Sequence, residues 1–152
     1  MGDKVTVRQS TIQDLAKLVP VFDSYREYFG QEKNPAAAEK FLFEKYEHRE
    51  SIVFIAEQQS QIVGFAQLYP SFSSLSLQRI WILNDFFIME NDRGKGIGKQ
   101  LIGAVIEYAS LTKAKGIELS VEHTNTKAWM YWEKQGFHLD EEFRYYMYKL
   151  RS

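Results

Sequence analysis

LNDFFIMENDRGKGIG, residues 83–98 of the chain, joins a strand-like run directly to a glycine-rich loop. Residues 77–88 are rich in β-branched and aromatic side chains, which predicts a long strand. From Ile97 onward apolar residues recur at helical spacing, which predicts a helix immediately after the loop. Glycines permit positive φ angles and the close approach of a ligand, and the first turn of a helix offers unpaired N–H groups. The stretch therefore predicts an anion site suited to phosphate.

Two common phosphate-binding patterns do not fit this loop. The Walker A pattern requires a hydroxyl side chain where the chain has Gln100, and the dinucleotide pattern requires glycine where it has Lys99 or Leu101. The pattern that remains is R-x-x-G-x-G, supplied by Arg93, Gly96 and Gly98. A flexible, positively charged turn is the alternative to a phosphate site.

The rest of the chain alternates between strand and helix patterns. Apolar spacings of three and four predict a helix from Ser10 or Thr11 to about Gly30, in which Pro20 marks a place for a kink or break. Asn34-Pro35 predicts the start of a second helix. Further expected elements are strands at 5–7, 52–56, 62–69, 117–121 and 143–150, a serine-rich loop at 70–76, and a short helix from about 125 to 136. This order predicts an α+β fold, a mixed sheet with helices on both faces.

Length and composition narrow the classes of protein. The 152 residues suit a single domain over 1–152. The net charge of −1 argues against nucleic acid as the main partner, and the absence of cysteine excludes disulfides and thiolate catalysis. The sequence has no histidine or carboxylate cluster with metal-ligand spacing and no apolar run of about 20 residues. We therefore expect a cytoplasmic protein without a metal and without a membrane partner.

The chain resembles the GNAT superfamily of N-acetyltransferases. The family signature Q/R-x-x-G-x-G/A is matched in the loop, and a second family pattern, N-x-x-A-x-x-φ-Y-E-x-x-G-F, is matched further on by Asn125, Ala128, Tyr131, Trp132, Glu133, Gly136 and Phe137. The resemblance implies an α/β/α fold with a central, splayed, mostly antiparallel sheet flanked by helices. It also implies acetyl-CoA as co-substrate and direct attack by an amine in a ternary complex.

The same resemblance implies a set of cofactor-binding residues. The strand would hold the pantetheine arm and the loop would wrap the pyrophosphate, through Phe86, Phe87, Ile88, Arg93, Gly94, Lys95, Gly96, Ile97, Gly98 and Lys99, with Asn125 and Trp132 further along the chain. The backbone N–H near Phe87 or Ile88 would polarise the thioester carbonyl.

One departure from the family pattern concerns the general acid. The tyrosine that usually protonates the departing thiolate falls at Trp132, and an indole N–H is not a useful proton donor near neutral pH. Tyr131 is the candidate acid, although neighbours on a helix point about 100° apart.

Asp85 is the candidate base that accepts the proton of the attacking amine, directly or through water. A buried structural acceptor for backbone N–H groups is the alternative for Asp85. Strict alternation along a strand would point Asn84 and Asp85 to opposite faces.

Candidate residues for the acceptor are Tyr28, Arg79 and Trp81, with Gln67 as a further one. Arg79 as a carboxylate clamp would favour an amino acid-like amine. A polyamine-like amine would require several acids, for which Asp23, Glu27 and Glu32 are available.

The sequence thus favours N-acetylation of the primary amine of a small molecule, amino acid-like or polyamine-like. A peptide or protein N-acetyltransferase and a non-catalytic acyl-CoA-binding module are the alternatives. The aromatic segment 143–148 could pair across a homodimer interface or within the chain.

Overall fold

The computed structural model describes residues 4–151, which form two compact units that divide after Leu119. The first unit contains β1 (Thr6–Gln9), η1 (Ile12–Asp14), α1 (Leu15–Tyr28), α2 (Pro35–His48), β2 (Ile52–Gln58), β3 (Gln61–Ser73), β4 (Gln78–Ile88), η2 (Glu90–Asp92), α3 (Ile97–Leu111) and β5 (Gly116–Glu118). The second contains α4 (Thr126–Lys134). The prediction of a single domain over 1–152 stays a prediction.

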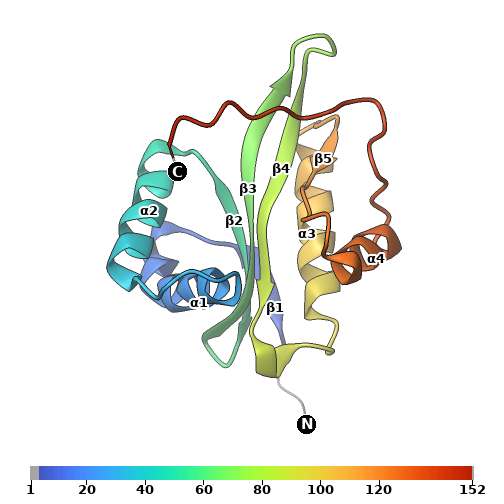
Figure 1. Ribbon diagram of the computed structural model, residues 1–152. Coiled ribbons are helices and arrows are strands. Elements are labelled where there is room, and N and C mark those ends of the chain that lie inside the picture. Colours follow the sequence, from blue (N-terminus) through green and yellow to red (C-terminus); the bar gives the residue numbers. More distant parts are fainter. Residues whose placement is uncertain (1–3, 152) are drawn as a thin grey trace. The chain divides into compact units, whose positions relative to one another are not determined.

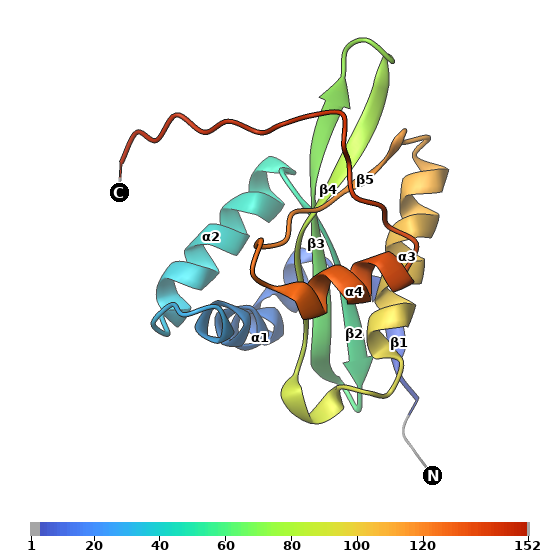
Figure 2. The ribbon, with the colours of Figure 1, turned by 45° about the vertical axis from the view of Figure 1, so that its right-hand side comes forward.

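The five strands form one mixed sheet in the order β1-β2-β3-β4-β5. Neighbours from β1 to β4 are antiparallel, and β5 runs parallel to β4. Helices α1 and α2 cover one face of the sheet and α3 covers the other (Figures 1 and 2). The predicted α+β fold with a mostly antiparallel sheet between helices is confirmed.

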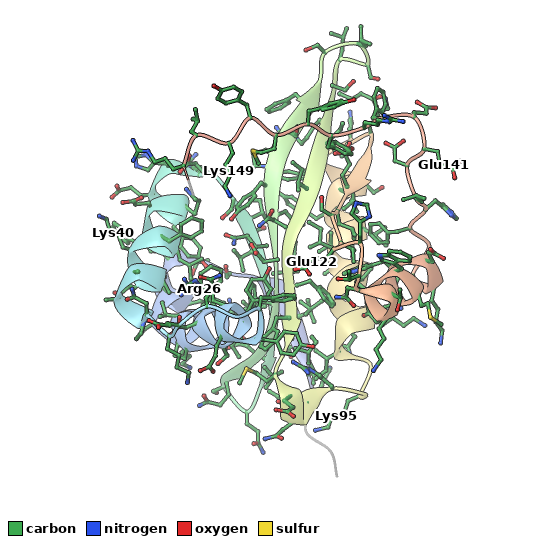
Figure 3. All side chains as sticks on the ribbon, in the orientation of Figure 1. Arg26, Lys40, Lys95, Glu122, Glu141 and Lys149 are labelled. Atoms are coloured by element: carbon green, nitrogen blue, oxygen red, sulfur yellow. The ribbon has the colours of Figure 1, made fainter. Side chains whose placement is uncertain are left out.

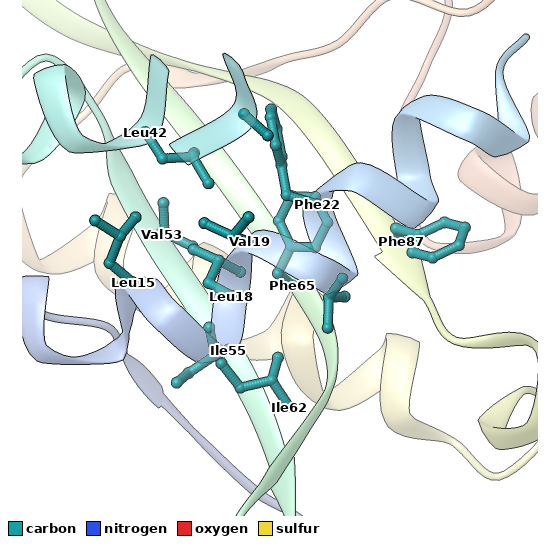
Figure 4. Packing of buried hydrophobic residues seen from close by; sticks show 12 residues of the cluster. Leu15, Leu18, Val19, Phe22, Leu42, Val53, Ile55, Ile62, Phe65 and Phe87 are labelled. Atoms are coloured by element: carbon teal, nitrogen blue, oxygen red, sulfur yellow. The ribbon is translucent and has the colours of Figure 1, made fainter. Parts of the chain in front are cut away.

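A large apolar cluster lies between the sheet and the pair α1 and α2 (Figure 4). It joins Leu18 and Phe22 of α1 and Leu42 of α2 to Ile55 and Phe65 of the sheet. Pro20 does not break α1, which is continuous through it. Because Pro20 is exposed, water can satisfy the carbonyl that loses its helical partner.

A bulge in β4 changes which face its side chains occupy. Gln67 pairs with Asp85 and Leu68 pairs with Leu83, so Asn84 is left without an opposite residue. Trp81 packs on Tyr108 of α3, with ring centroids 5.3 Å apart. Phe87, an even number of residues later, instead packs on Tyr25 of α1 at 5.8 Å. The bulge therefore turns Phe87 toward α1 and leaves Trp81 facing α3.

One edge of β4 is free over its second half. On that edge β5 pairs only with Ile80, Trp81 and Ile82, and no other described strand pairs there. From residue 83 to residue 88 no described strand pairs with that side of β4, as at the edge of a sheet. This is the splay implied by the family resemblance.

Three sequence predictions are corrected. Residues 143–150 form no strand and their side chains are exposed, because residues 120–151 contain no other strand to pair with. The strand expected at 62–69 continues to Ser73 through Pro70. Because β2 begins at Ile52, opposite Leu68, residues 69–73 of β3 have an unpaired edge where a missing N–H is tolerated. The strand expected at 117–121 is Gly116–Glu118. The homodimer stays a prediction.

Candidate active site

The N-terminus of α3 is open because its cap is a glycine. Gly94 and Gly96 have φ angles of 77° and 81°, and a Cβ at either position would meet no atom within 4 Å. Gly96 is the N-cap of α3, and no side chain caps the helix. The N–H groups of the first turn thus have no side-chain cap and lie at the positive end of a 15-residue helix.

Two cationic side chains of the glycine loop, Lys95 and Arg93, make different contacts. Lys95 lies on the loop below β4 (Figure 3), 3.6 Å from the carboxylate of Asp92. Arg93 donates from Nε to the carbonyl of Ile88 at 2.9 Å. The Arg93 guanidinium also stacks on the rings of Tyr28 and Phe87, 5.1 and 5.2 Å from their centroids. Arg93 therefore braces the loop against β4 and α1. Its expected contact with the pyrophosphate stays a prediction.

This packing bears on Tyr28, which the sequence assigns to the acceptor site. Tyr28 is 63% exposed, and its ring contacts Arg93 and Phe87 at the loop end of β4 as well as the neighbouring Phe29. Its expected contact with the acceptor stays a prediction. Ile97 has its side chain 1% exposed in the core, so only its N–H can serve a ligand.

The edge of β4 to which each backbone N–H points distinguishes the two predicted oxyanion donors, Phe87 and Ile88. The N–H of Met89 donates to Val63 of β3, whereas the carbonyl of Ile88 accepts from Arg93 on the other side. Backbone groups of successive residues alternate between the two edges of an antiparallel strand. Phe86 and Ile88 therefore present their N–H and C=O groups to the free edge, and Phe87 presents its own to β3. Of the two candidate oxyanion donors, only Ile88 directs its N–H to the free edge. Phe87 instead packs its ring against Tyr25 and Arg93.

Asp85 is buried at the bulge and its oxygens accept from side-chain amides. Its side chain is 6% exposed. Gln67 Nε2 donates to Oδ2 at 2.7 Å, and Asn84 Nδ2 donates to Oδ1 at 3.2 Å. The contact with Asn84 corrects the expectation of strict alternation, which the bulge interrupts.

Two tyrosines complete the surroundings of Asp85. Burial, the charge of Asp85 and a hydrogen bond to it raise the pKa of Tyr25 above its ordinary value, in that order of size. Burial, then the charges of Asp85 and Glu50, raise the pKa of Tyr69. Both phenols therefore stay neutral near pH 7 and can donate to a carboxylate. Tyr69 is not among the site residues predicted from the sequence, where its only signal is its place at the end of the expected strand 62–69.

Arg79 and Trp81 lie on the opposite face of the sheet. Trp81 is buried and its Nε1 donates to Thr112 Oγ1 of α3 at 2.9 Å. The Arg79 guanidinium stacks over the rings of Phe72 and Trp81, at 5.3 and 5.0 Å. The prediction that both contact an acceptor beside Asp85 does not fit this placement, because the bulge at Asn84 separates the two faces.

In the second unit, backbone groups at both ends of α4 find hydrogen-bond partners within residues 125–137. Asn125 Oδ1 accepts from the N–H of Ala128 at 3.2 Å, which caps the N-terminus. Gly136 has φ 99°, and Phe137 N–H donates to the carbonyl of Trp132 at 3.0 Å. The rings of Trp132 and Phe137 lie 5.3 Å apart, which completes a Schellman cap. The second family pattern thus encodes a helix that is capped at both its N-terminus and its C-terminus.

Tyr131 lies on α4 with its ring 5.1 Å from that of Trp132. Burial raises its pKa, so its hydroxyl keeps its proton through the neutral range. A protonated phenol can act as an acid, whereas the indole of Trp132 cannot.

Among residues 4–151 no helix is long and apolar enough to span a bilayer, and no cluster of three metal-ligating side chains occurs.

Comparison with known proteins identifies the family. The sequence profile of the acetyltransferase (GNAT) family matches residues 18–137. YhfO, an uncharacterised N-acetyltransferase of Bacillus subtilis (strain 168), is 41% identical over 142 residues, which are 93% of this chain and 95% of that protein. The spermine/spermidine N(1)-acetyltransferase of the same organism is 36% identical over 88 residues, 55% of this chain and 57% of that protein.

Solved structures agree with this result. A probable acetyltransferase matches with a TM-score of 0.91 at 35% identity, covering 97% of this chain and 99% of that chain. The chain belongs to the acetyltransferase (GNAT) family and is an acetyl-CoA-dependent N-acetyltransferase.

Proposed function

We propose that the chain moves the acetyl group of acetyl-CoA to the primary amine of a small, cationic molecule by direct attack in a ternary complex. The observation that carries this proposal is the buried Asp85 on the stretch of β4 that β5 leaves unpaired. Ile88 directs its N–H to that edge three residues along β4 from Asp85, so a thioester bound there lies near the carboxylate. An alkyl ammonium must lose a proton before it can attack, and Asp85 accepts it directly or through water.

The other catalytic and cofactor-binding roles are assigned to hydrogen-bond donors of β4, α3 and α4. The amine nitrogen bonds to the thioester carbon, the N–H of Ile88 stabilises the oxyanion, and the C–S bond breaks. Tyr131 gives a proton to the thiolate, and the second proton that the nitrogen loses on becoming an amide restores the Tyr131 hydroxyl through water. The first-turn N–H groups of α3, with Lys95 and Lys99, hold the pyrophosphate above Gly94, Gly96 and Gly98. Asn125 and Trp132 stay candidates for further cofactor contacts.

The placement of charges favours a polyamine-like acceptor over an amino acid-like one. The carboxylate clamp expected at Arg79 is on the other face, stacked on two rings. Asp23 is not available to a substrate, because its oxygens accept from the N–H of Asn34 and pair with Arg26. Asp85 and the tyrosines around it suit a cation. The partial similarity to a spermine/spermidine acetyltransferase supports the same class.

The experiment is a release assay for free coenzyme A thiol with acetyl-CoA and a panel of polyamines, amino acids, aminoglycosides and peptides. We expect turnover with polyamine-like amines above the others. Preference for peptides would move the assignment to a protein N-acetyltransferase. Tight acetyl-CoA binding without turnover on any amine would indicate a binding module.

Asp85→Asn tests the base. We expect kcat/KM to fall about 100-fold, because general base catalysis is typically worth that much or more. Glu90→Gln is the matched control, since it removes one carboxylate from an exposed position near the end of the same strand. We expect this control to stay within twofold of the wild type. Equal activity of both variants would remove Asp85 from the mechanism.

A further inference from the structure

Gln67 is a fully buried amide at the centre of the sheet. It stands directly across from Asp85 in the β3–β4 ladder and is 0% exposed. Its Nε2 donates to Asp85 Oδ2 at 2.7 Å, yet its Oε1 is buried and has no partner among the described residues. A buried carbonyl without a donor costs stability, so packing alone does not explain an amide at this position.

We propose that Gln67 is the positioning residue of Asp85: its amide donates to the carboxylate and, after a half-turn, accepts from the carboxylic acid. Asp85 then keeps one hydrogen bond in both states that it visits during proton transfer. This inference rests on the proposed function, which gives Asp85 the proton of the attacking amine.

The proton balance explains why an amide suits this position. In the resting state Nε2–H faces Oδ2. When Asp85 takes the proton of the amine on Oδ2, the new O–H would face the N–H of Gln67, and two donors cannot form a hydrogen bond. A half-turn of the amide exchanges Nε2 and Oε1, so the unpartnered oxygen becomes the acceptor of the new O–H. The atom that lacks a partner at rest is thus the one needed after proton transfer.

The other groups that face Asp85 cannot replace this one. Asn84 of β4 also donates an amide N–H, but it is exposed and water competes for it. Tyr25 of α1 and Tyr69 of β3 contribute neutral hydroxyls. Gln67 is the buried member of the group whose contact is shielded from water.

Gln67→Met tests the proposal, because methionine has a similar length and shape but neither donates nor accepts strongly. We expect the ¹³C signal of the Asp85 carboxyl, measured at pH 7 without substrates, to move, since the carboxylate loses a donor. The acidic limb of kcat/KM for the amine should move upward for the same reason. We expect kcat to fall about tenfold and the KM for acetyl-CoA to stay within twofold.

Ser10→Ala is the matched control. Ser10 is also buried, and its hydroxyl shares a hydrogen bond of 2.6 Å with the Tyr46 hydroxyl in another part of the unit. The loss of this hydroxyl should lower the melting temperature without moving the carboxyl signal of Asp85 or the acidic limb of kcat/KM. An unmoved carboxyl signal and an unmoved acidic limb in Gln67→Met would overturn the proposal.

Gln67→Glu keeps the test decisive if the methionine variant does not fold. A second carboxyl opposite Asp85 should raise the acidic limb further than Gln67→Met, because like charges resist ionisation of both. An unchanged limb would again overturn the proposal. If Asp85→Asn were fully active while Gln67→Met still moved the carboxyl signal of Asp85, the base assignment would fail and the coupling of the two residues would stand.

Discussion

The helices α3 and α4 both begin within a family pattern, but their N-termini differ in what satisfies them. The cap of α3 is Gly96, which has no side chain to offer its first-turn N–H groups. The cap of α4 is Asn125, whose Oδ1 accepts from Ala128. The first pattern therefore leaves backbone donors for a ligand, whereas the second uses its own polar groups to end a helix. Matching residue patterns in one family thus carry different physical roles.

The same substitution in both patterns gives the largest expected contrast. Gly96 and Gly136 have φ angles of 81° and 99°, and a Cβ at either meets no atom within 4 Å. Alanine therefore costs about 1 kcal/mol of backbone strain at each. We expect Gly96→Ala also to weaken acetyl-CoA binding by roughly 30-fold, about 2 kcal/mol, because the methyl group stands where the pyrophosphate would meet the N–H groups. Gly136→Ala should lower stability alone. Calorimetric titration and thermal melts separate the two effects.

Gly103→Ala is the control for both variants. Gly103 lies in the interior of α3 with nothing within 4 Å of a Cβ, and it is exposed. Alanine there should raise the free energy of unfolding by about 0.5–1 kcal/mol and leave affinity unchanged. Equal affinity losses in Gly96→Ala and Gly136→Ala would erase the distinction between the two patterns.

Tyr131→Phe tests whether the second family pattern also supplies the general acid. Burial raises the pKa of Tyr131, so the acid is protonated at neutral pH and is lost only as pH rises beyond the ordinary value of about 10. We expect kcat to fall about tenfold, a modest factor because a thiolate leaves readily, and the alkaline limb to disappear. Tyr148→Phe, at an exposed position in the same unit, should change neither quantity. A wild-type rate with a wild-type alkaline limb in Tyr131→Phe would leave Tyr131 as a packing residue.

Asn125 gives the smallest expected effect. Asn125→Ala removes the cap and should lower the free energy of unfolding by about 1 kcal/mol, whereas Asn125→Asp keeps an oxygen acceptor and most of the stability. Thermal melts of the two variants decide this. Equal melting temperatures for the alanine variant and the wild type would contradict the capping role.

The predictable parts of the molecule are those set by local chemistry. The glycine loop, the start of α2 at Pro35 and the order of the elements depend on short-range conformational preferences, and the sequence pattern reports these directly. The bulge at Asn84 depends on the register between β3 and β4, so no pattern in β4 alone reveals that Arg79 and Asp85 occupy opposite faces. Residues 143–150 have a strand composition, but a strand also needs a partner. The contact between Gln67 and Asp85 joins residues 18 positions apart and follows from the same register.

The most direct test of the anion site is an amide-resolved NMR titration of the protein with coenzyme A. We expect the largest shifts at the N–H groups of Ile97, Gly98 and Lys99, with further shifts at Phe86 and Ile88 on the free edge of β4. Saturating coenzyme A that left the first-turn amides of α3 unshifted would contradict the assignment of the pyrophosphate to this helix N-terminus.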